Sequence, residues 1–351
     1  IPAIGKANRA IALYEGFLHG IPAAHVMLSP LTTQEAVLSS RIEGTQATLG
    51  DVLKFEAGEE PNQPERSLDI GEIINYRSAL RVAETDLKNK PFNLNMLKKL
   101  HAILLNSVRG HDKRRGEFRN TQNFIGRPGS LIKDAYFVPP SPLGLFDHLS
   151  DWEKYYHAER PDALVQLAVI HAQFEILHPF DDGNGRLGRI IIPLFLYEKR
   201  LLNRPMFYMS AWFDRNRDEY ITRLRSIGKE PDAWNNWVLF FLKGVAEQAT
   251  LNCEKAQAIM ALYKDLSERS LKATRSQYGI PMLDQMFQRP IFQSKHFSFP
   301  HLPPTAATVS NLLREMKDAD IIKVLTPGGG RRGTTYVLAE LINLCEGKKV
   351  F

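Results

Sequence analysis

The 351-residue sequence predicts a mainly α-helical protein with one β-hairpin and a small C-terminal winged-helix domain. Three observations support this fold class. Apolar residues recur at a spacing of three to four over most of the chain, which is the helical period. Two short β-prone runs flank a Gly/Pro-rich turn near residue 128. Beyond residue 277 prolines accumulate, and a last helical segment then leads into a Gly/Arg loop between β-prone runs.

The helices are predicted from this spacing and from their end signals. Thr32 and Glu35 have the separation of a capping box, and Gly44 can supply a left-handed stop, so an early helix is expected between them. Further helices are expected at 73–87, 94–105, 143–156, 163–177, 190–202 and 232–270.

The hairpin is predicted at 123–138, where the runs 123–125 and 135–138 enclose Gly126, Pro128 and Gly129. An isolated hairpin is marginal by itself, so it should lean on helices or keep a free edge for a purpose. In the tail, a helix within 305–322 precedes two short strands around GGGRRG, the pattern of a winged helix-turn-helix domain. We therefore expect an N-terminal helical region (1–90), a helical core (91–275) and a winged domain (276–351).

Composition limits the class of protein. With 44% hydrophobic and 24% charged residues, the chain resembles an ordinary globular protein, and its longest apolar run, near 190–197, is too short for a membrane span. No basic-then-apolar leader is visible, and Cys253 and Cys345 are too few for a disulfide framework, so a cytoplasmic protein without a membrane partner is expected. The net charge of +6 permits a polyanionic partner without requiring one.

The stretch HPFDDGNGRLGR at 178–189 is too polar for a core. Pro179 disfavours continuation of the preceding helix, and Gly183 and Gly185 allow positive φ and close backbone approach. A helix that restarts near residue 184 would direct its free N–H groups at this loop, which makes an anion site. Arg186 and Arg189, three apart, can both reach towards phosphate oxygens.

The same stretch holds groups for metal binding and proton transfer. Asp181 or Asp182 offers a hard oxygen ligand to Mg²⁺, which binds through one or two carboxylates plus substrate phosphates. His178 can take a proton near neutral pH. Singly, each element is usually structural: paired arginines at a helix start are mostly surface residues, and a histidine before proline mostly shapes the chain. Together they predict a triphosphate site beside a hydroxyl nucleophile.

HPFDDGNGRLGR resembles the motif HPFx(D/E)GNGRxxR of Fic-domain proteins, with every fixed position filled. Residues 116–119 and the hairpin resemble the flap region of that family, and the tail resembles the winged domain that many Fic proteins append. The likeness covers nearly the whole chain. It implies a Fic-type helical core with a hairpin flap, and a Mg²⁺-dependent protein adenylyltransferase that transfers AMP from ATP to a Ser, Thr or Tyr hydroxyl of a target protein or of itself.

The resemblance also assigns roles to positions of the motif. His178 resembles the general base, Asp182 the Mg²⁺ ligand and Phe180 the anchor of the loop in the core. Gly183, Asn184 and Gly185 match the anion hole, with the Asn184 side chain on the α-phosphate; Arg186 matches the β-phosphate contact and Arg189 the γ-phosphate contact. The kinase-like branch of the family has lysine at the position of Gly185, so the glycine favours AMP transfer.

An inhibitory element is expected upstream of this motif. Ser39, Glu43 and Gly44 match the family's pattern (S/T)xxxE(G/N), although an acid near a helix end is more simply an exposed residue. The resemblance implies that Glu43 pairs with Arg189, occupies the γ-phosphate position and inhibits the enzyme. The same glutamate could instead align a water that removes AMP, and the sequence leaves both roles open.

Partners follow from the hairpin and the tail. The free edge of the hairpin 123–138 could pair with an extended segment of the target, or the hairpin could be a simple connection. In the tail, DNA could bind through 305–335, where the groove-facing candidates are Thr305, Thr308, Ser310 and Asn311 with Arg331 and Arg332 in the wing. Residues 280–351 contain nine basic and six acidic residues, a small surplus for DNA, and winged domains also dock proteins.

The alternative function is therefore a DNA-binding transcriptional regulator in which the Fic pocket serves as a nucleotide sensor. The target, the modified residue and the oligomeric state, including a homodimer, are left open by the sequence.

Overall fold

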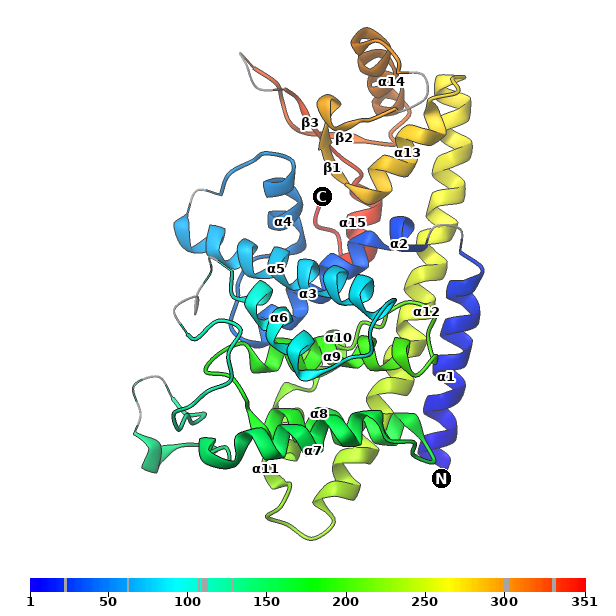
Figure 1. Cartoon of the computed structure of the whole chain (residues 1–351). Coiled ribbons are helices and arrows are strands. Elements are labelled where there is room, and N and C mark those ends of the chain that lie inside the picture. The colour runs from blue at the N-terminus through cyan, green and yellow to red at the C-terminus, as the bar shows by residue number, and fades with distance from the viewer. Residues whose placement is uncertain are drawn as a thin grey trace. The chain divides into compact units, whose positions relative to one another are not determined.

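The computed structural model describes residues 1–21, 24–61, 63–106, 108, 113–127, 129, 131–299, 303–329 and 333–351. The protein is mainly α-helical, as predicted, and a small sheet is formed within the described residues (Figure 1). By its contacts the chain divides into two compact units, one of Ile1–Gly16, Leu38–Thr45 and Gly71–Leu251, the other of Phe17–Val37, Gln46–Ile70 and Asn252–Phe351. The boundaries expected at residues 90 and 275 stay a prediction.

The first unit consists of helices. It contains most of α1 (Pro2–His19), all of α6 (Leu94–Leu104), η1 (Ile132–Asp134), η2 (Pro142–Gly144), α7 (Leu145–His157), α8 (Ala163–Leu177), α9 (Asn184–Glu198), α10 (Ser210–Arg215) and α11 (Arg217–Ser226), and parts of α3 (Ser29–Ile42), α5 (Pro64–Leu87) and α12 (Ala233–Thr274). Helix α8 packs against both α7 and α9 (Figure 1).

The core of this unit surrounds α8, which is apolar on nearly every face. Two indoles fix it through backbone carbonyls: Trp152 Nε1 donates to Ile170 O at 3.0 Å, and Trp237 Nε1 donates to Ala168 O at 2.8 Å. Helix α9 is buried almost along its whole length, from Leu187 to Leu196. A helix that is hydrophobic all round belongs in a core, so the loop between α8 and α9 is held at both ends by rigid elements.

The second unit contains the sheet. Its elements are α2 (Ala24–Met27), α4 (Leu49–Glu56), α13 (Gly279–Gln288), β1 (Ile291–Gln293), η3 (Ser294–His296), α14 (Ala306–Asp318), β2 (Lys323–Thr326), β3 (Thr335–Val337) and α15 (Ala339–Glu346). Strand β3 lies between β1 and β2 and is antiparallel to both, with Val337 opposite Ile291 on one side and Lys323 on the other.

The predicted tail helix is α14, whose apolar residues Val309, Leu312, Leu313 and Met316 are buried as core packing requires. It ends at Asp318, before the predicted limit of residue 322, and two strands follow it. Arg331 and Arg332 of the predicted wing lie outside the described residues. The winged-helix assignment stays a prediction.

Two local predictions were wrong in detail. Helix α3 begins at Ser29, so Thr32 and Glu35 lie inside it and do not form its capping box. Pro30 explains the earlier start, because proline lacks an N–H group and is tolerated in a first helical turn. The hairpin at 123–138 is reduced to one antiparallel bridge between Ile125 and Phe137, where Ile125 N donates to Phe137 O at 2.8 Å.

Two further observations concern the cysteines and the length of the apolar helices. Cys253 and Cys345 are both free thiols, and Cys345 is buried. Within the described part of the chain, no helix combines the length and the apolar character that crossing a bilayer requires.

We expect Asp162→Ala to destabilise the protein because Asp162 caps α8. Its Oδ1 accepts from Val165 N at 2.8 Å, and its Oδ2 accepts from Asn8 Nδ2 at 2.7 Å. Loss of such a cap costs about 1–2 kcal/mol, which urea unfolding would measure. The matched control is Asp151→Ala on α7, whose exposed carboxylate pairs only with Lys154 among the described residues and should matter by less than about 0.5 kcal/mol. Equal losses in both variants would contradict the capping role.

Candidate active site

The motif 178–189 forms a tight corner between α8 and α9. His178 ends α8 in the left-handed conformation, with φ of 45°, and Pro179 prevents the helix from continuing. Gly183 is also left-handed, with φ of 78°, and α9 begins at the next residue. Left-handed backbone is unfavourable for a residue with a side chain. The corner at His178 therefore requires support from its surroundings.

Arg119 supplies part of that support. Its guanidinium donates to four backbone carbonyls, those of His178 at 2.9 Å, Pro140 at 2.6 Å, and Leu177 and Thr121 at 3.3 Å each. One buried side chain thus ties the end of α8 to the segments on both sides of the flap. From the sequence, Arg119 was expected only as part of a segment that resembles the family, and this role was not predicted.

His101 supports the other half of the loop. Its ring stacks on Phe180 with centroids 3.9 Å apart, and burial lowers its pKa to about 4, so the ring is neutral. Gly116 N donates to Nδ1 at 2.8 Å, so the proton must be on Nε2, which then donates to the Asp182 carbonyl at 3.0 Å. This role of His101 was not predicted, although a histidine among the apolar positions of 94–105 was a signal for it.

Asn184 holds the loop through its side chain. Its Oδ1 accepts from Phe180 N at 2.9 Å, and its Nδ2 donates to Phe180 O at 2.8 Å. An amide nitrogen has two N–H bonds, and one of them is directed at Phe180. The contact with an α-phosphate that the resemblance implies would have to use the other, and it stays a prediction.

His178 faces a cavity of about 420 Å³ that it shares with Gly185 and Arg189. Burial lowers the pKa of His178 to about 4, against the opposing effect of the Glu43 charge. The imidazole is therefore neutral at physiological pH and able to accept a proton. The cavity is also lined by flap residues and by α11, including Phe124, Ile125, Phe137, Tyr220, Ile221 and Leu224.

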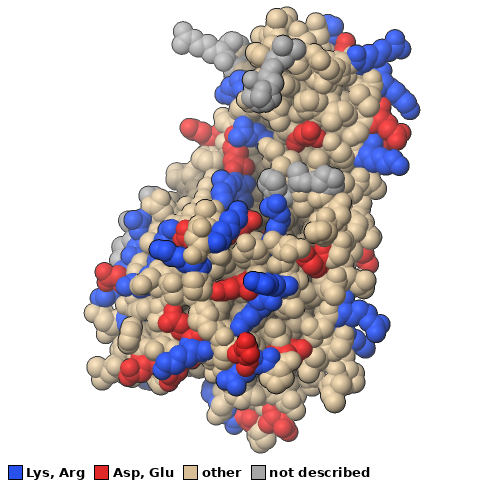
Figure 2. Space-filling model, turned by 45° about the vertical axis from the view of Figure 1, so that its right-hand side comes forward, with Lys and Arg blue, Asp and Glu red and all other residues tan. Residues whose placement is uncertain are grey.

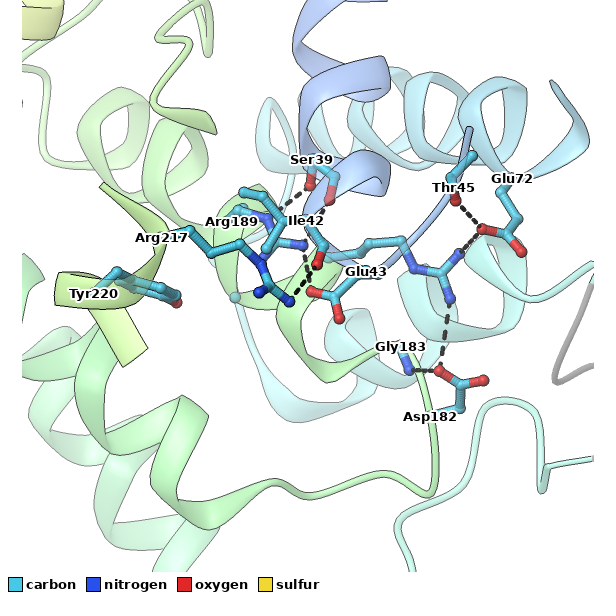
Figure 3. Close-up of polar contacts among 12 residues, drawn as sticks. Ser39, Ile42, Glu43, Thr45, Glu72, Asp182, Gly183, Arg189, Arg217 and Tyr220 are labelled. Atoms are coloured by element: carbon cyan, nitrogen blue, oxygen red, sulfur yellow. Dashed lines mark hydrogen bonds and ion pairs between the residues drawn. The ribbon is translucent and has the colours of Figure 1, made fainter. Parts of the chain in front are cut away.

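The guanidinium of Arg189 donates hydrogen bonds to Ser39 and Glu43 at the C-terminal end of α3 (Figure 3). Its Nη2 donates to Glu43 Oε1 at 2.6 Å and to Ser39 O at 2.9 Å, and its Nε donates to Ser39 Oγ at 2.8 Å. The Arg189 side chain is 1% exposed, whereas 41% of the Glu43 side chain remains exposed. Burial opposes ionisation of Glu43, but the charge and hydrogen bond of Arg189 outweigh it and lower the pKa of this carboxyl.

Gly185 lies directly beneath the Glu43 carboxylate. A Cβ atom at this position would overlap with Glu43 Oε1, so a residue with a side chain is incompatible with this placement of Glu43. The end of α3 is further held by Arg217 on α11, whose Nη2 donates to Ile42 O at 3.3 Å (Figure 3). The carboxylate thus covers the start of α9, where an anion would otherwise meet free N–H groups.

Arg186 is paired with acids of its own. Its Nη1 lies 3.2 Å from Glu72 Oε2 on α5, and its Nη2 lies 3.7 Å from Asp182 Oδ1. Thr45, just after the inhibitory pattern, donates to Glu72 Oε2 at 2.8 Å. The Arg186 and Glu72 side chains are 4% and 5% exposed. The two motif arginines, Arg186 and Arg189, are therefore buried and each is paired with an acid. The part that Glu72 plays here was not predicted from the sequence.

Asp182 is the residue to which the resemblance assigns the metal. Its side chain is 44% exposed, and burial of its other part raises its pKa, against the charge of Arg186. Among the described residues no cluster of three or more His, Cys, Asp or Glu side chains could hold an ion by protein ligands alone. The partly exposed Asp182 carboxylate fits the mode in which Mg²⁺ takes most of its ligands from phosphates and water.

Two family models together match more than half of the chain, within residues 1–196. The Fic/DOC family N-terminal model matches residues 1–85, and the Fic/DOC family model matches residues 91–196. A probable protein adenylyltransferase of Aquifex aeolicus is 28% identical over 206 residues, which cover 56% of this chain and 55% of that protein. The protein adenylyltransferase fic-1 of Caenorhabditis elegans is 27% identical over 163 residues, covering 44% and 30%. The chain thus spans about half or less of these relatives' lengths.

Solved structures share the fold. A Fic family protein from Desulfovibrio desulfuricans superimposes with a TM-score of 0.60 at 18% identity, covering 96% of each chain. A Fic domain containing signaling protein from Bacteroides thetaiotaomicron gives a TM-score of 0.58 at 17% identity, covering 73% of this chain and 97% of that one. With both family models matched in succession and the HPFDDGNGRLGR corner folded between two buried helices, the chain belongs to the Fic/DOC family.

Proposed function

We propose that this chain is a protein adenylyltransferase that moves AMP from ATP to a hydroxyl of a target protein or of itself. The names of the Aquifex and Caenorhabditis relatives support this activity. The observation that carries the proposal is the convergence of His178, Gly185 and Arg189 on one cavity. A neutral base, an anion-binding helix start and a guanidinium are the groups that nucleotide transfer to a hydroxyl requires.

In the proposed reaction, His178 accepts the proton of the target hydroxyl. The hydroxyl oxygen forms a bond to the α-phosphorus of ATP, the bond from that phosphorus to the bridging oxygen breaks, and pyrophosphate leaves. The N–H groups at the start of α9 stabilise charge on the α-phosphate, while Arg186 and Arg189 hold the β- and γ-phosphates. A Mg²⁺ ion bound by Asp182 would neutralise phosphate charge.

The rest of the cavity suits the other parts of the complex. Apolar side chains of α11 and the flap, such as Leu224 and Phe124, can enclose the adenosine. The single bridge between Ile125 and Phe137 leaves most backbone groups of the described flap residues outside any sheet. An extended segment of the target can therefore add to 123–138 as a strand and bring its hydroxyl to His178.

We further propose that Glu43 inhibits this enzyme. Its carboxylate accepts a hydrogen bond from the guanidinium of Arg189 and lies over Gly185. The γ-phosphate of ATP would therefore find this donor already hydrogen-bonded and would be repelled by the negative charge of Glu43. The other role, in which Glu43 aligns a water that removes AMP, predicts slower loss of AMP from a labelled target when Glu43 is replaced.

The face shown in Figure 2 gives no support to the alternative of a DNA-binding regulator. On the face shown in Figure 2, Lys and Arg side chains are interspersed with Asp and Glu side chains and form no continuous basic stripe. DNA binding depends on many phosphate contacts. Binding through 305–335, a homodimer and a cytoplasmic location stay predictions.

We expect Glu43→Gly to raise AMP incorporation at least about tenfold, because loss of one charge-assisted hydrogen bond, typically worth about 1.5–3 kcal/mol, frees Arg189. Incorporation from α-labelled ATP, with mass spectrometry of the protein and of lysate targets, would measure it. Addition of His178→Ala to this variant should abolish the signal. An unchanged rate would contradict inhibition, and slower loss of AMP from a labelled target would favour the water-aligning role.

Ser39→Ala should give a smaller increase than Glu43→Gly. It removes the acceptor of Arg189 Nε but leaves the contacts of Nη2 with Glu43 and with the backbone of residue 39. The matched control is Ser40→Ala, since Ser40 Oγ is buried without a hydrogen-bond partner among the described residues. The same labelling assay applies. A rise in the control equal to that in Ser39→Ala would indicate general loosening of α3.

The pH profile should show that the base stays neutral well below pH 6.5. Because burial lowers the pKa of His178 to about 4, the transfer rate of Glu43→Gly at saturating ATP should change less than about twofold between pH 7 and pH 5.5. Removal of Glu43 also removes the charge that raises this pKa. A group with an ordinary histidine pKa would lose about tenfold over the same interval. Circular dichroism would verify folding at the lower pH.

A further inference from the structure

The described part of the flap (123–138) has little secondary structure to hold it in place. Its residues form one antiparallel bridge, in which Ile125 N donates to Phe137 O at 2.8 Å. Ile125 O accepts from Tyr136 N at 2.7 Å and from Phe137 N at 3.1 Å. Burial adds little, because 36% of Ile125 and 43% of Tyr136 remain exposed. Since an isolated hairpin is marginal by itself, other contacts must keep this segment beside the cavity that Ile125 and Phe137 line.

The base of the flap is fixed by two side-chain amides. Gln122 Nε2 donates to Pro139 O at 2.9 Å and so joins the residues that flank the flap at its two ends. Asn123 Nδ2 donates to Phe180 O at 3.0 Å and ties the first flap residue to the motif loop. Both contacts act at the base. The residues beyond the bridge require a separate support.

Tyr136 receives such support from two arginines. The guanidinium of Arg225, on α11, lies over the Tyr136 ring with its Cζ 4.7 Å from the ring centroid. Arg127, from the opposite run of the flap, donates from its Nε to the Tyr136 hydroxyl at 2.7 Å. A guanidinium within about 6 Å of an aromatic centroid is attracted by the negative face of the ring. The contact of Arg225 with Tyr136 is therefore a cation–π interaction that joins the flap to a helix outside it.

Helix α11 is a firm attachment for the flap. Its residue Tyr220 is 5% exposed, and the Tyr220 hydroxyl lies 2.9 Å from His171 Nε2 on α8. The centroid of the Tyr220 ring lies 4.5 Å from that of Phe213 and 5.9 Å from that of Trp237. Buried aromatic rings contribute large contact areas with specific geometry. Arg225 thus extends to the flap from a helix that is packed into the core.

We propose that Arg225 is a positioning residue for the protein target: by binding the ring of Tyr136 it holds the flap beside the cavity, where an extended target segment can pair with it and bring a hydroxyl to His178. The pair of Arg225 and Tyr136 is called the flap latch below. The proposal rests on the proposed function, since it takes the flap as the docking edge for the target. Arg225 itself also lines the cavity, so direct binding of the nucleotide is the competing role.

The flap latch affects the use of the target because it orders the docking edge in advance. A segment that becomes ordered only when its partner binds loses conformational freedom at that moment, and this loss weakens the affinity. A flap already held by α11 avoids part of it. Loss of the latch should therefore raise the KM for the target and leave the affinity for Mg-ATP unchanged. A cation–π contact at an exposed site corresponds to a factor of about two to five.

The first measurement is hydrogen exchange of the full chain, read by mass spectrometry on flap peptides. Arg225→Ala should speed exchange of the Ile125, Tyr136 and Phe137 amides about two- to fivefold, because the open flap no longer loses the cation–π contact. Tyr136→Leu should also speed it, whereas Tyr136→Phe keeps the ring and should retain most of the protection. Adding Arg225→Ala to Tyr136→Leu should have no further effect, since the latch is already lost.

The second measurement is AMP incorporation from α-labelled ATP in the Glu43→Gly background. With a fixed, dilute amount of lysate protein as acceptor, Arg225→Ala should lower the initial rate about two- to fivefold, and the difference should shrink as the lysate is concentrated. The Kd for Mg-ATP, measured by calorimetry on the same variants with His178→Ala, should stay unchanged. The matched control is Arg223→Ala on the same helix, whose guanidinium pairs with Glu219 and which should change none of these quantities.

The outcomes separate the flap latch from its alternatives. Unchanged flap exchange in Arg225→Ala and Tyr136→Leu would overturn the proposal, and so would equal acceleration in Arg223→Ala, which would indicate general loosening of α11. A rise in the Kd for Mg-ATP that matches the loss of labelling would overturn it in favour of nucleotide binding by Arg225. Faster flap exchange with unchanged labelling would refute the role in target positioning. Failure of Glu43→Gly to incorporate AMP would overturn the proposed function, while hydrogen exchange would still report on the latch.

Discussion

The site depends on how a buried guanidinium is neutralised. Arg189 is almost fully enclosed, and an isolated charge in such a place would cost several kcal/mol. Ser39 and Glu43 from α3 satisfy it in this structure, and burial strengthens these contacts because water is excluded from them. Any ligand that takes Arg189 must replace this arrangement with one of comparable quality. Under the proposed function, the terminal phosphate of ATP is this ligand, since it brings several oxygen acceptors and negative charge to the same donors.

The corner that carries the motif shows a second constraint. His178 has left-handed backbone, which a side chain makes unfavourable, and the structure compensates with neighbours that act on carbonyl groups. Arg119 bonds the carbonyl of His178, and His101 bonds that of Asp182. Arg119 and His101 thus stabilise the backbone of the loop. The imidazole of His178 is thereby held beside the cavity, as its proposed role as a general base requires.

The sequence predicted the helical class, the break after residue 177 and the restart at 184, because periodicity, Pro179 and the glycines act locally. The pairing of Glu43 with Arg189, 146 residues apart, came only from the family resemblance, since no local rule brings such residues together. Glu72, His101 and Arg119 were missed for the same reason: each acts on the loop from another helix or segment. The hairpin was overestimated, because β-prone runs of three or four residues need partner strands to form more than a single bridge.

The nearest counter-charges of the two motif arginines come from upstream of the stretch that the second family model spans. Glu43 and Glu72 both precede residue 91, whereas Arg186 and Arg189 lie within 91–196. Cutting the chain at that border would leave buried Arg189 without its counter-charge and Arg186 with only the more distant Asp182. The stretch that the first family model matches therefore supplies part of the scaffold of the site, and the end of α3 belongs to it.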